Sequence, residues 1–252
     1  MKSFEIEWVK KKSLKRGTVI KGVPGIGNIS HICVDYIKTK LKAELVCNIY
    51  SPYLPNIVLV NKDCTVSLPS FQLYLKEVKG QKIILLLSNY QPKEQIHSYE
   101  FSENLVSFLK KEGVKEIITI AGIGLKDLPN KITLHIATAD VKVQKKLKQY
   151  KELLFDGPKS VALIVGSAGL ILGFAKKYNL SAFGILASTW AHPQHIGIKE
   201  SKFVLQFLNN YLNIKLDFAD LNNEIKKINE QIREITKEAE KVSTEERGNY
   251  IG

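Results

Sequence analysis

The sequence predicts an α/β fold, in which a mainly parallel, twisted sheet carries helices on both faces and a coiled-coil helix follows at the C-terminal end. Strand and helix patterns alternate along most of the chain. Two mainly apolar runs, at residues 82–88 and 116–121, have the hydrophobicity of strands that are buried on both faces. Alternation of this kind is typical of parallel sheets whose connecting helices cover both sides.

The first half of the chain begins with a short strand, a glycine-rich turn and an apolar-periodic helix. Further along, Phe71, Leu73 and Leu75 alternate with polar residues, which indicates a half-exposed antiparallel strand. Proline and asparagine residues separate these segments and mark turns. In order, we expect strands at residues 18–21, 45–50, 57–60, 70–78 and 82–88, and helices at 29–41 and 94–112.

The second half repeats the succession of strand, glycine-rich turn, helix and strand, so that residues 162–185 echo residues 19–45. We interpret this echo as two uses of one structural unit. Periodicity and turn residues give the boundaries. We expect strands at residues 116–121, 131–137, 160–165 and 182–188, and helices at 140–154, 166–178 and 199–212.

The C-terminal part differs in kind, because apolar residues recur there at alternating steps of four and three. This spacing is a heptad seam, and isoleucine at both core positions favours three or four copies over two. We predict a homo-oligomer, a tetramer, with a head at residues 1–213, a heptad helix at 214–242 and a flexible tail at 243–252. The seam residues are Leu221, Ile225, Ile228, Ile232, Ile235, Ala239 and Val242.

The net charge of +12 raises nucleic acid as a partner, but its distribution argues against one. Nine acidic and six basic residues leave residues 217–252 at −3, so the rest of the chain carries +15. Almost all of that charge is lysine, whereas base readout favours arginine. There is no apolar run long enough for a membrane span and no signal-peptide pattern, so we expect a cytoplasmic protein. Three scattered cysteines suit small, buried or half-buried apolar positions.

The sequence contains segments similar to catalytic or phosphate-binding motifs, but none of these motifs is complete. Gly22-x-Pro-Gly-x-Gly27 opens a helix as phosphate loops do, but it is not a dinucleotide fingerprint and its proline offers no N–H. We interpret it as a tight turn and keep Gly22, Gly25, Gly27 and Asn28 as a possible anion-binding loop. Gly166-Ser-Ala-Gly169 lacks the first glycine of the hydrolase elbow.

Two histidines, His192 and His195, could serve as a base or as metal ligands. No acidic residue stands out in the sequence to orient either one as a base. Pro193 makes a regular helix across the pair improbable, and no third ligand lies near it. We therefore expect no catalytic residue, no metal and no cofactor.

Three segments together carry a family resemblance. Lys21-Gly-Val-Pro-Gly-Ile-Gly-Asn28 resembles the opening signature of the proteasome-assembly-chaperone superfamily. Gly166-Ser-Ala-Gly-Leu-Ile-Leu-Gly173 and Phe183-Gly-Ile-Leu-Ala-Ser-Thr189, followed by His192-Pro193, resemble its later segment. The resemblance covers residues 17–221 and implies a fold similar to that of purine nucleoside phosphorylases. It also implies that archaeal members form oligomers and bind the α-subunits of the 20S proteasome.

One archaeal branch of that superfamily ends in a hydrophobic–Tyr–any-residue motif, which enters pockets of the α-ring. Here Tyr250 is third from the end, Ile251 is penultimate and Gly252 is last, so the order is shifted by one. The resemblance therefore implies an archaeal, non-enzymatic assembly chaperone or activator-like scaffold that docks through these three residues. The alternative is a phosphate- or nucleotide-binding enzyme that uses the glycine-rich loops at residues 22–27, 122–124 and 166–169.

Overall fold

The computed structural model describes residues 3–223 and residue 225. The chain divides into two compact units, Met1–Leu216 and Asp217–Gly252. In the second unit, residues 219–223 and residue 225 are helical. Within the part of the chain that the structure describes, no helix is long and apolar enough to cross a membrane.

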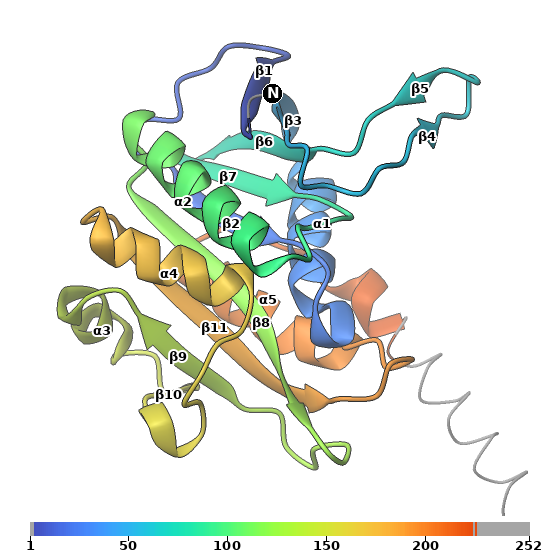
Figure 1. Ribbon diagram of the computed structural model, residues 1–252. Helices are drawn as coiled ribbons and strands as arrows, with labels where there is room; N and C mark the ends of the chain where they lie inside the picture. Colours follow the sequence, from blue (N-terminus) through green and yellow to red (C-terminus); the bar gives the residue numbers. More distant parts are fainter. Residues whose placement is uncertain (1–2, 224, 226–252) are drawn as a thin grey trace, which may run out of the picture. The chain divides into compact units, whose positions relative to one another are not determined.

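The first unit is built on a nine-stranded mixed sheet (Figure 1). Its four central strands are parallel, whereas the strands on one flank pair antiparallel, and on the other flank β9 runs antiparallel to β11. In spatial order the strands are β1 (Glu5–Trp8), β3 (Glu44–Tyr50), β6 (Phe71–Val78), β7 (Gln81–Leu87), β2 (Thr18–Gly22), β8 (Glu116–Leu125), β11 (Ser181–Trp190), β9 (Leu134–Thr138) and β10 (Leu153–Leu154).

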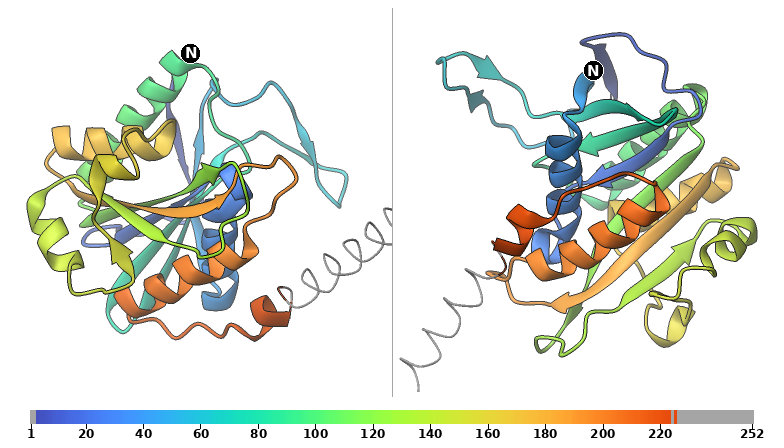
Figure 2. Two further views of the ribbon diagram at one scale, coloured as in Figure 1. Left: turned by 90° about the horizontal axis from the view of Figure 1, so that it is seen from below. Right: turned by 180° about the vertical axis from the view of Figure 1, so that it is seen from behind.

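Helices cover both faces of this sheet, as the sequence predicts. Figure 1 shows α2 (Gln95–Lys111) and α4 (Ser167–Lys177) in front of the strands. The view from behind in Figure 2 shows α1 (Ile29–Leu41) and α5 (Ile198–Tyr211) on the opposite face. A shorter helix, α3 (Val141–Leu147), begins at Asp140, whose carboxylate accepts hydrogen bonds from two backbone N–H groups.

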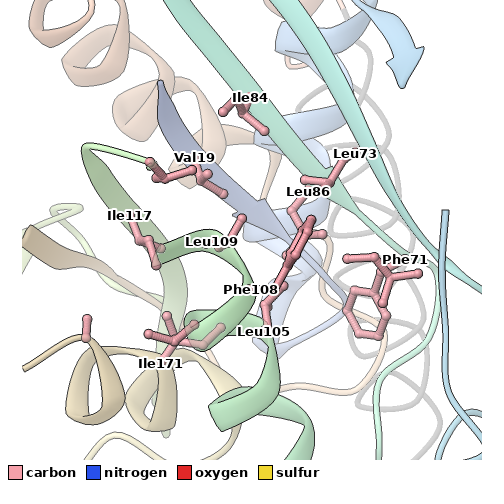
Figure 3. Packing of buried hydrophobic residues seen from close by; sticks show 14 of the residues in the cluster. Val19, Phe71, Leu73, Ile84, Leu86, Leu105, Phe108, Leu109, Ile117 and Ile171 are labelled. Carbon is pink, nitrogen blue, oxygen red and sulfur yellow. The ribbon is translucent and has the colours of Figure 1, made fainter. Parts of the chain in front are cut away.

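The main core lies between the sheet and the pair α2 and α4 (Figure 3). Val19, Ile84 and Leu86 point from the central strands towards Leu105 of α2 and Ile171 of α4. Burial of apolar surface of this extent is the dominant favourable term in folding. The core therefore fixes the central strands, and with them the positions of the loops at their carboxyl ends.

The α/β class is confirmed, and the sheet is less parallel than expected. The predicted coiled-coil helix at residues 214–242 lies largely outside the described residues and stays a prediction. Short connections join β6 to β7, and such hairpins produce antiparallel pairs. The predicted helix at residues 140–154 is α3 alone, followed by the two-residue strand β10. The predicted strand at 57–60 is reduced to β4 (Leu59–Val60), and β1 was missed.

Two further segments differ from the prediction. The expected strand at residues 160–165 is irregular, with Leu163 and Val165 84% and 91% exposed, so its apolar run does not reflect burial in a sheet. By contrast, β8 continues through Gly122 and Gly124, where a loop was expected. A Cβ on Gly122 would lie 2.7 Å from the carbonyl oxygen of Ile26, so this glycine permits close packing inside a strand.

A hairpin arm, defined by residues 57–68, projects from the first unit (Figure 1). It consists of β4 and β5 (Val66–Ser67), which pair only with each other. A two-stranded hairpin is at best marginally stable by itself. Its exposed large apolar side chains are Ile57, Val58, Val60, Val66 and Leu68.

Candidate functional site

The candidate site lies at the carboxyl ends of the central parallel strands, where α/β folds commonly bind ligands. Two glycine-led turns lie there. The first glycine turn, residues 22–28, leads from β2 into α1 through a short 3-10 segment, Ile26–Asn28. The second glycine turn, residues 166–169, opens α4.

The first glycine turn is closely packed by neighbouring protein groups. A Cβ on Gly22 would lie 2.4 Å from Cβ of Val34, so α1 can approach β2 only because Gly22 has no side chain. Gly27 has a φ of 63°, and its carbonyl oxygen accepts a hydrogen bond of 2.7 Å from the N–H of Gly197. Gly22 is therefore explained by close packing, and Gly27 by its backbone conformation, without a bound ligand.

The same turn was the predicted anion-binding loop. Asn28, the residue before α1, is in the left-handed region, with φ at 52°, and makes no side-chain cap hydrogen bond. Its N–H donates to the carbonyl of Gly25, and the hydroxyl of Ser30 donates to the carbonyl of Lys21. These bonds join the turn to itself and to β2, and anion binding at Gly22, Gly25, Gly27 and Asn28 stays a prediction.

A buried carboxylate lies close to the first glycine turn. Glu200, near the start of α5, is 2% exposed. Its Oε1 accepts a 2.7 Å hydrogen bond from the hydroxyl of Thr189 and lies 2.8 Å from Nε2 of His195. The expectation that no acidic residue orients His195 is therefore wrong. Because Thr189 is fully buried and bonded to the same oxygen, we interpret this cluster as a brace between β11 and α5.

A second buried polar cluster lies beside the second glycine turn. Lys21, at 2% exposed, donates from Nζ a 2.8 Å hydrogen bond to Oγ of Ser167. Ser167 in turn donates a 2.8 Å bond to Oε1 of Gln91, and Nε2 of Gln91 donates to the carbonyl of Pro24. Ser167 at the start of α4 is thus connected to the end of β2 through Lys21 and to the first glycine turn through Gln91.

The electrostatic setting of Lys21 is unusual, because a buried ammonium normally has an anionic partner. Among the residues that the structure describes, no carboxylate forms a salt bridge with Lys21. Burial alone lowers the pKa of Lys21 to about 7. Near neutral pH this amine is therefore neutral in a large fraction of molecules and can accept a proton.

An apolar groove of about 660 Å³ lies next to the second glycine turn. Its walls come from α4, from the end of β9 and from the exposed segment at residues 161–164. A separate, more polar groove of about 280 Å³ lies at the base of the hairpin arm, where Nε2 of His31 is 2.8 Å from Oδ1 of Asn89. The described residues include no group of three or more His, Cys, Asp or Glu that could hold a metal ion.

Most of the predicted binding residues cannot be placed. Of the heptad seam, Leu221 is buried and Ile225 is half-buried. The cysteine interpretation holds for Cys33 and Cys47 and is wrong for Cys64, which is exposed. Outside the described residues lie Ile228, Ile232, Ile235, Ala239, Val242, Tyr250, Ile251 and Gly252.

The cluster of Lys21, Gln91 and Ser167 was not predicted from the sequence. One signal was present, because Lys21 is the single charged residue in a short, mainly apolar strand. Such a lysine is either at a strand end in solvent or buried for a reason, and the sequence does not distinguish the two. Gln91 and Ser167 lie 70 and 146 positions away from Lys21, so nothing local connects them.

Most of the chain matches a known family. The sequence profile of the PAC2 family matches residues 19–236. An uncharacterized protein of Methanocaldococcus jannaschii is 28% identical over 250 residues, which cover 95% of this chain and 93% of that protein.

Solved structures share the fold. Pyrococcus furiosus PbaB, described as an archaeal proteasome activator, has a TM-score of 0.84 at 22% identity, covering 94% of this chain and 100% of that chain. PbaA of the same organism, described as an archaeal homolog of proteasome-assembly chaperone, has a TM-score of 0.76 at 20% identity, covering 97% of both chains.

Proposed function

Because this chain belongs to the PAC2 family, we propose that it is a scaffold without enzymatic turnover that binds the α-subunits of a 20S proteasome. The family resemblance predicted from the glycine-rich segments is confirmed. The observation that carries the proposal is the likeness of the fold to that of the archaeal proteasome activator PbaB along nearly the whole chain. An α-ring partner would also place the protein in the cytoplasm.

Docking is assigned to the C-terminal residues of the sequence. Tyr250 and Ile251 offer an aromatic and an aliphatic side chain after a polar segment, and Gly252 follows them. An aromatic side chain with one polar end is favoured at protein interfaces. The shifted order of these residues changes which side chain enters the pocket, and Tyr250 is the one that we assign to it.

Assembly through the heptad seam is the second part of the proposal. In this arrangement residues 1–213 form the head, residues 214–242 join four copies and residues 243–252 form the docking tail. Tails held on one oligomer face a ring of repeated pockets at high effective concentration, which raises overall affinity by roughly 10²–10⁴-fold without new contacts.

A pull-down of cognate α-subunits and of 20S particles tests both parts. We expect full-length protein to retain them, and we expect deletion of residues 250–252 or Tyr250→Ala to abolish retention. Asn249→Ala is the matched control, because it changes the adjacent tail residue and keeps all three assigned ones.

The same assay separates docking from assembly. Ile228→Asp with Ile232→Asp should convert the oligomer to monomer in light scattering and weaken retention on the order of 10²-fold. Asn229→Asp lies between these seam positions and should change neither result. If full-length protein retains no proteasome component, the proposal is wrong. If retention survives the tail deletion, docking through Tyr250 is wrong.

A further inference from the structure

The second glycine turn places a serine against a buried lysine, and neither is explained by proteasome binding. We propose that Ser167 is a nucleophile that takes up one acyl group from an activated ester, with Lys21 as its general base. This inference does not rest on the proposed function, since it concerns a site in the head. It requires one acyl transfer per chain rather than turnover.

The hydrogen bonds around Ser167 suit a proton transfer. Oγ of Ser167 lies 2.8 Å from Nζ of Lys21, which is within the distance needed for direct transfer. When the lysine is neutral, its nitrogen is an acceptor, and the single hydroxyl proton can turn to it from Oε1 of Gln91. Gln91 is itself fixed by its bond to the Pro24 carbonyl, so the serine is held between two positioned partners.

Donors for a developing oxyanion lie at the same place. Ser167 is the first residue of α4, and the first N–H groups of a helix have no partner within it. Gly166, just before it, has a φ of 81° and a ψ of −167°, a conformation that favours glycine. A Cβ on Gly169 would lie 2.2 Å from the carbonyl oxygen of Ile164, so glycine also lets the preceding segment pass close to the helix.

The neighbouring groove indicates what kind of acyl group would fit. Its lining includes Ile164 and Gly169, which flank Ser167 in sequence, together with Leu170, Leu172 and Gly173 along α4. The lining is mainly apolar, with Thr138, Lys176 and Lys177 among its polar members, and the volume of about 660 Å³ is ample for a short aliphatic chain. Ser167 is 7% exposed and does not itself line the groove, so the proposed reaction requires the ester carbonyl to reach its hydroxyl from there. The substrate class is therefore an ester with a small apolar acyl group and a good leaving group.

The proposed step balances without a further reactant. Oγ of Ser167 attacks the carbonyl carbon of the ester, and its proton passes to Nζ of Lys21. The bond between the carbonyl carbon and the leaving oxygen breaks, and the leaving group departs as its oxygen anion. The products are an acyl-serine, a lysine ammonium and the anion of the leaving group.

The test incubates the full-length protein with 4-nitrophenyl butyrate. We expect a burst of nitrophenolate of about one equivalent per chain and a butyryl adduct that peptide mapping places on Ser167. The rate should rise with pH and level off above about 7, because the neutral lysine is the base. Mapping is done on the unaltered protein, so the result does not depend on whether a variant folds.

Variants then assign the roles. Ser167→Ala should lose the adduct, and Lys21→Met should slow its formation by at least about 100-fold, which is the contribution of a general base. The matched control is Ser102→Ala, which also removes a buried serine hydroxyl. Unlike that of Ser167, the hydroxyl of Ser102 has no hydrogen-bond partner among the described residues. Adducts confined to surface lysines, or an equal rate at Ser167 in Lys21→Met, would overturn the proposal. Proteasome retention should be unchanged in Ser167→Ala.

Discussion

The two glycine turns lie at the same edge of the sheet and each opens a helix, yet they are used in different ways. In the first, Gly22 lies against Val34, and the carbonyl of Gly27 is bonded to Gly197. In the second, Gly166 has no neighbouring heavy atom where a Cβ would be, and an apolar groove lies alongside. Each turn contains a glycine with open space around it, Gly25 in the first and Gly166 in the second, but only the second turn contributes to the lining of the groove.

The buried charges beside the two turns differ in the same sense. Glu200, beside the first turn, is paired with Thr189 and His195. Lys21 directly precedes the first turn in the chain, but its side chain reaches the second, where among the described residues its ammonium bonds only to the hydroxyl of Ser167. A buried charge without an opposite charge costs stability, and such groups cluster at functional sites. The two turns therefore differ in their surroundings, and a glycine-rich sequence alone does not distinguish them.

The largest expected effect comes from removing the unpaired charge with Lys21→Met. The folded protein lowers the pKa of Lys21 from 10.5 to about 7, so between these values the unfolded chain binds more protons than the native state. Stability should therefore rise with pH across this window, by at most about 1.4 kcal/mol per pH unit. The Lys21→Met variant should not show this rise. Urea unfolding of the wild-type protein and of the variant at pH 7 and pH 9.5 measures the change in the free energy of unfolding.

Below pH 7 the lysine is protonated in both states, so the full cost of burying its charge remains. The variant should be the more stable protein there, and the difference should shrink as the pH rises. A difference that does not change with pH would mean that Lys21 has a counter-ion, and the contrast between the two turns would fail.

A smaller effect is expected from filling the first turn. Gly22→Ala places a methyl group against Val34 and should lower the free energy of unfolding by about 2 kcal/mol, as overpacking of a core does. Gly25→Ala is the matched control, because its Cβ meets nothing within 4 Å and its φ of −167° suits any residue. The two urea midpoints give the comparison, and equal midpoints would show that the first turn is not packed tightly.

The smallest effect is expected beside the second turn. Gly173 lies within α4, lines the groove, and would give a Cβ no contact within 4 Å. Gly173→Ala should therefore raise the free energy of unfolding by about 0.5–1 kcal/mol, through better helix propensity alone. A rise in the thermal midpoint checks this. A fall would show that the groove is closed by groups packed on α4.

Much of the fold could be predicted because the signals are local. The mainly apolar sequences of β7 and β8 and the 3.6-residue periodicity of α2 indicated the type of element directly. The strand prediction at residues 160–165 failed because the same apolar run is compatible with a buried strand and with an exposed loop. The antiparallel direction of the flanking strands was not predicted, because strand pairing depends on partners that are distant in the chain.

The candidate site was harder to predict, because it is assembled from three distant segments. Gly166 and Ser167 were noticed as part of a motif, but the base was sought among histidines. The structure brings Lys21 to Ser167 across 146 positions. His195 showed the reverse error, since its partner Glu200 is only five positions away, across an irregular loop that no periodicity describes.

The order of the strands has a consequence for folding during synthesis. The turn between β6 and β7 has positive φ at Lys79 and Gly80, which suits a tight two-residue hairpin that closes in microseconds. By contrast, β2 pairs only with β7 and β8, both of which are made later. At about 5–20 residues per second, β2 leaves the ribosome roughly 3 to 12 seconds before β7 begins. For that time its apolar residues have no neighbouring strand, and nascent chains are then exposed to aggregation.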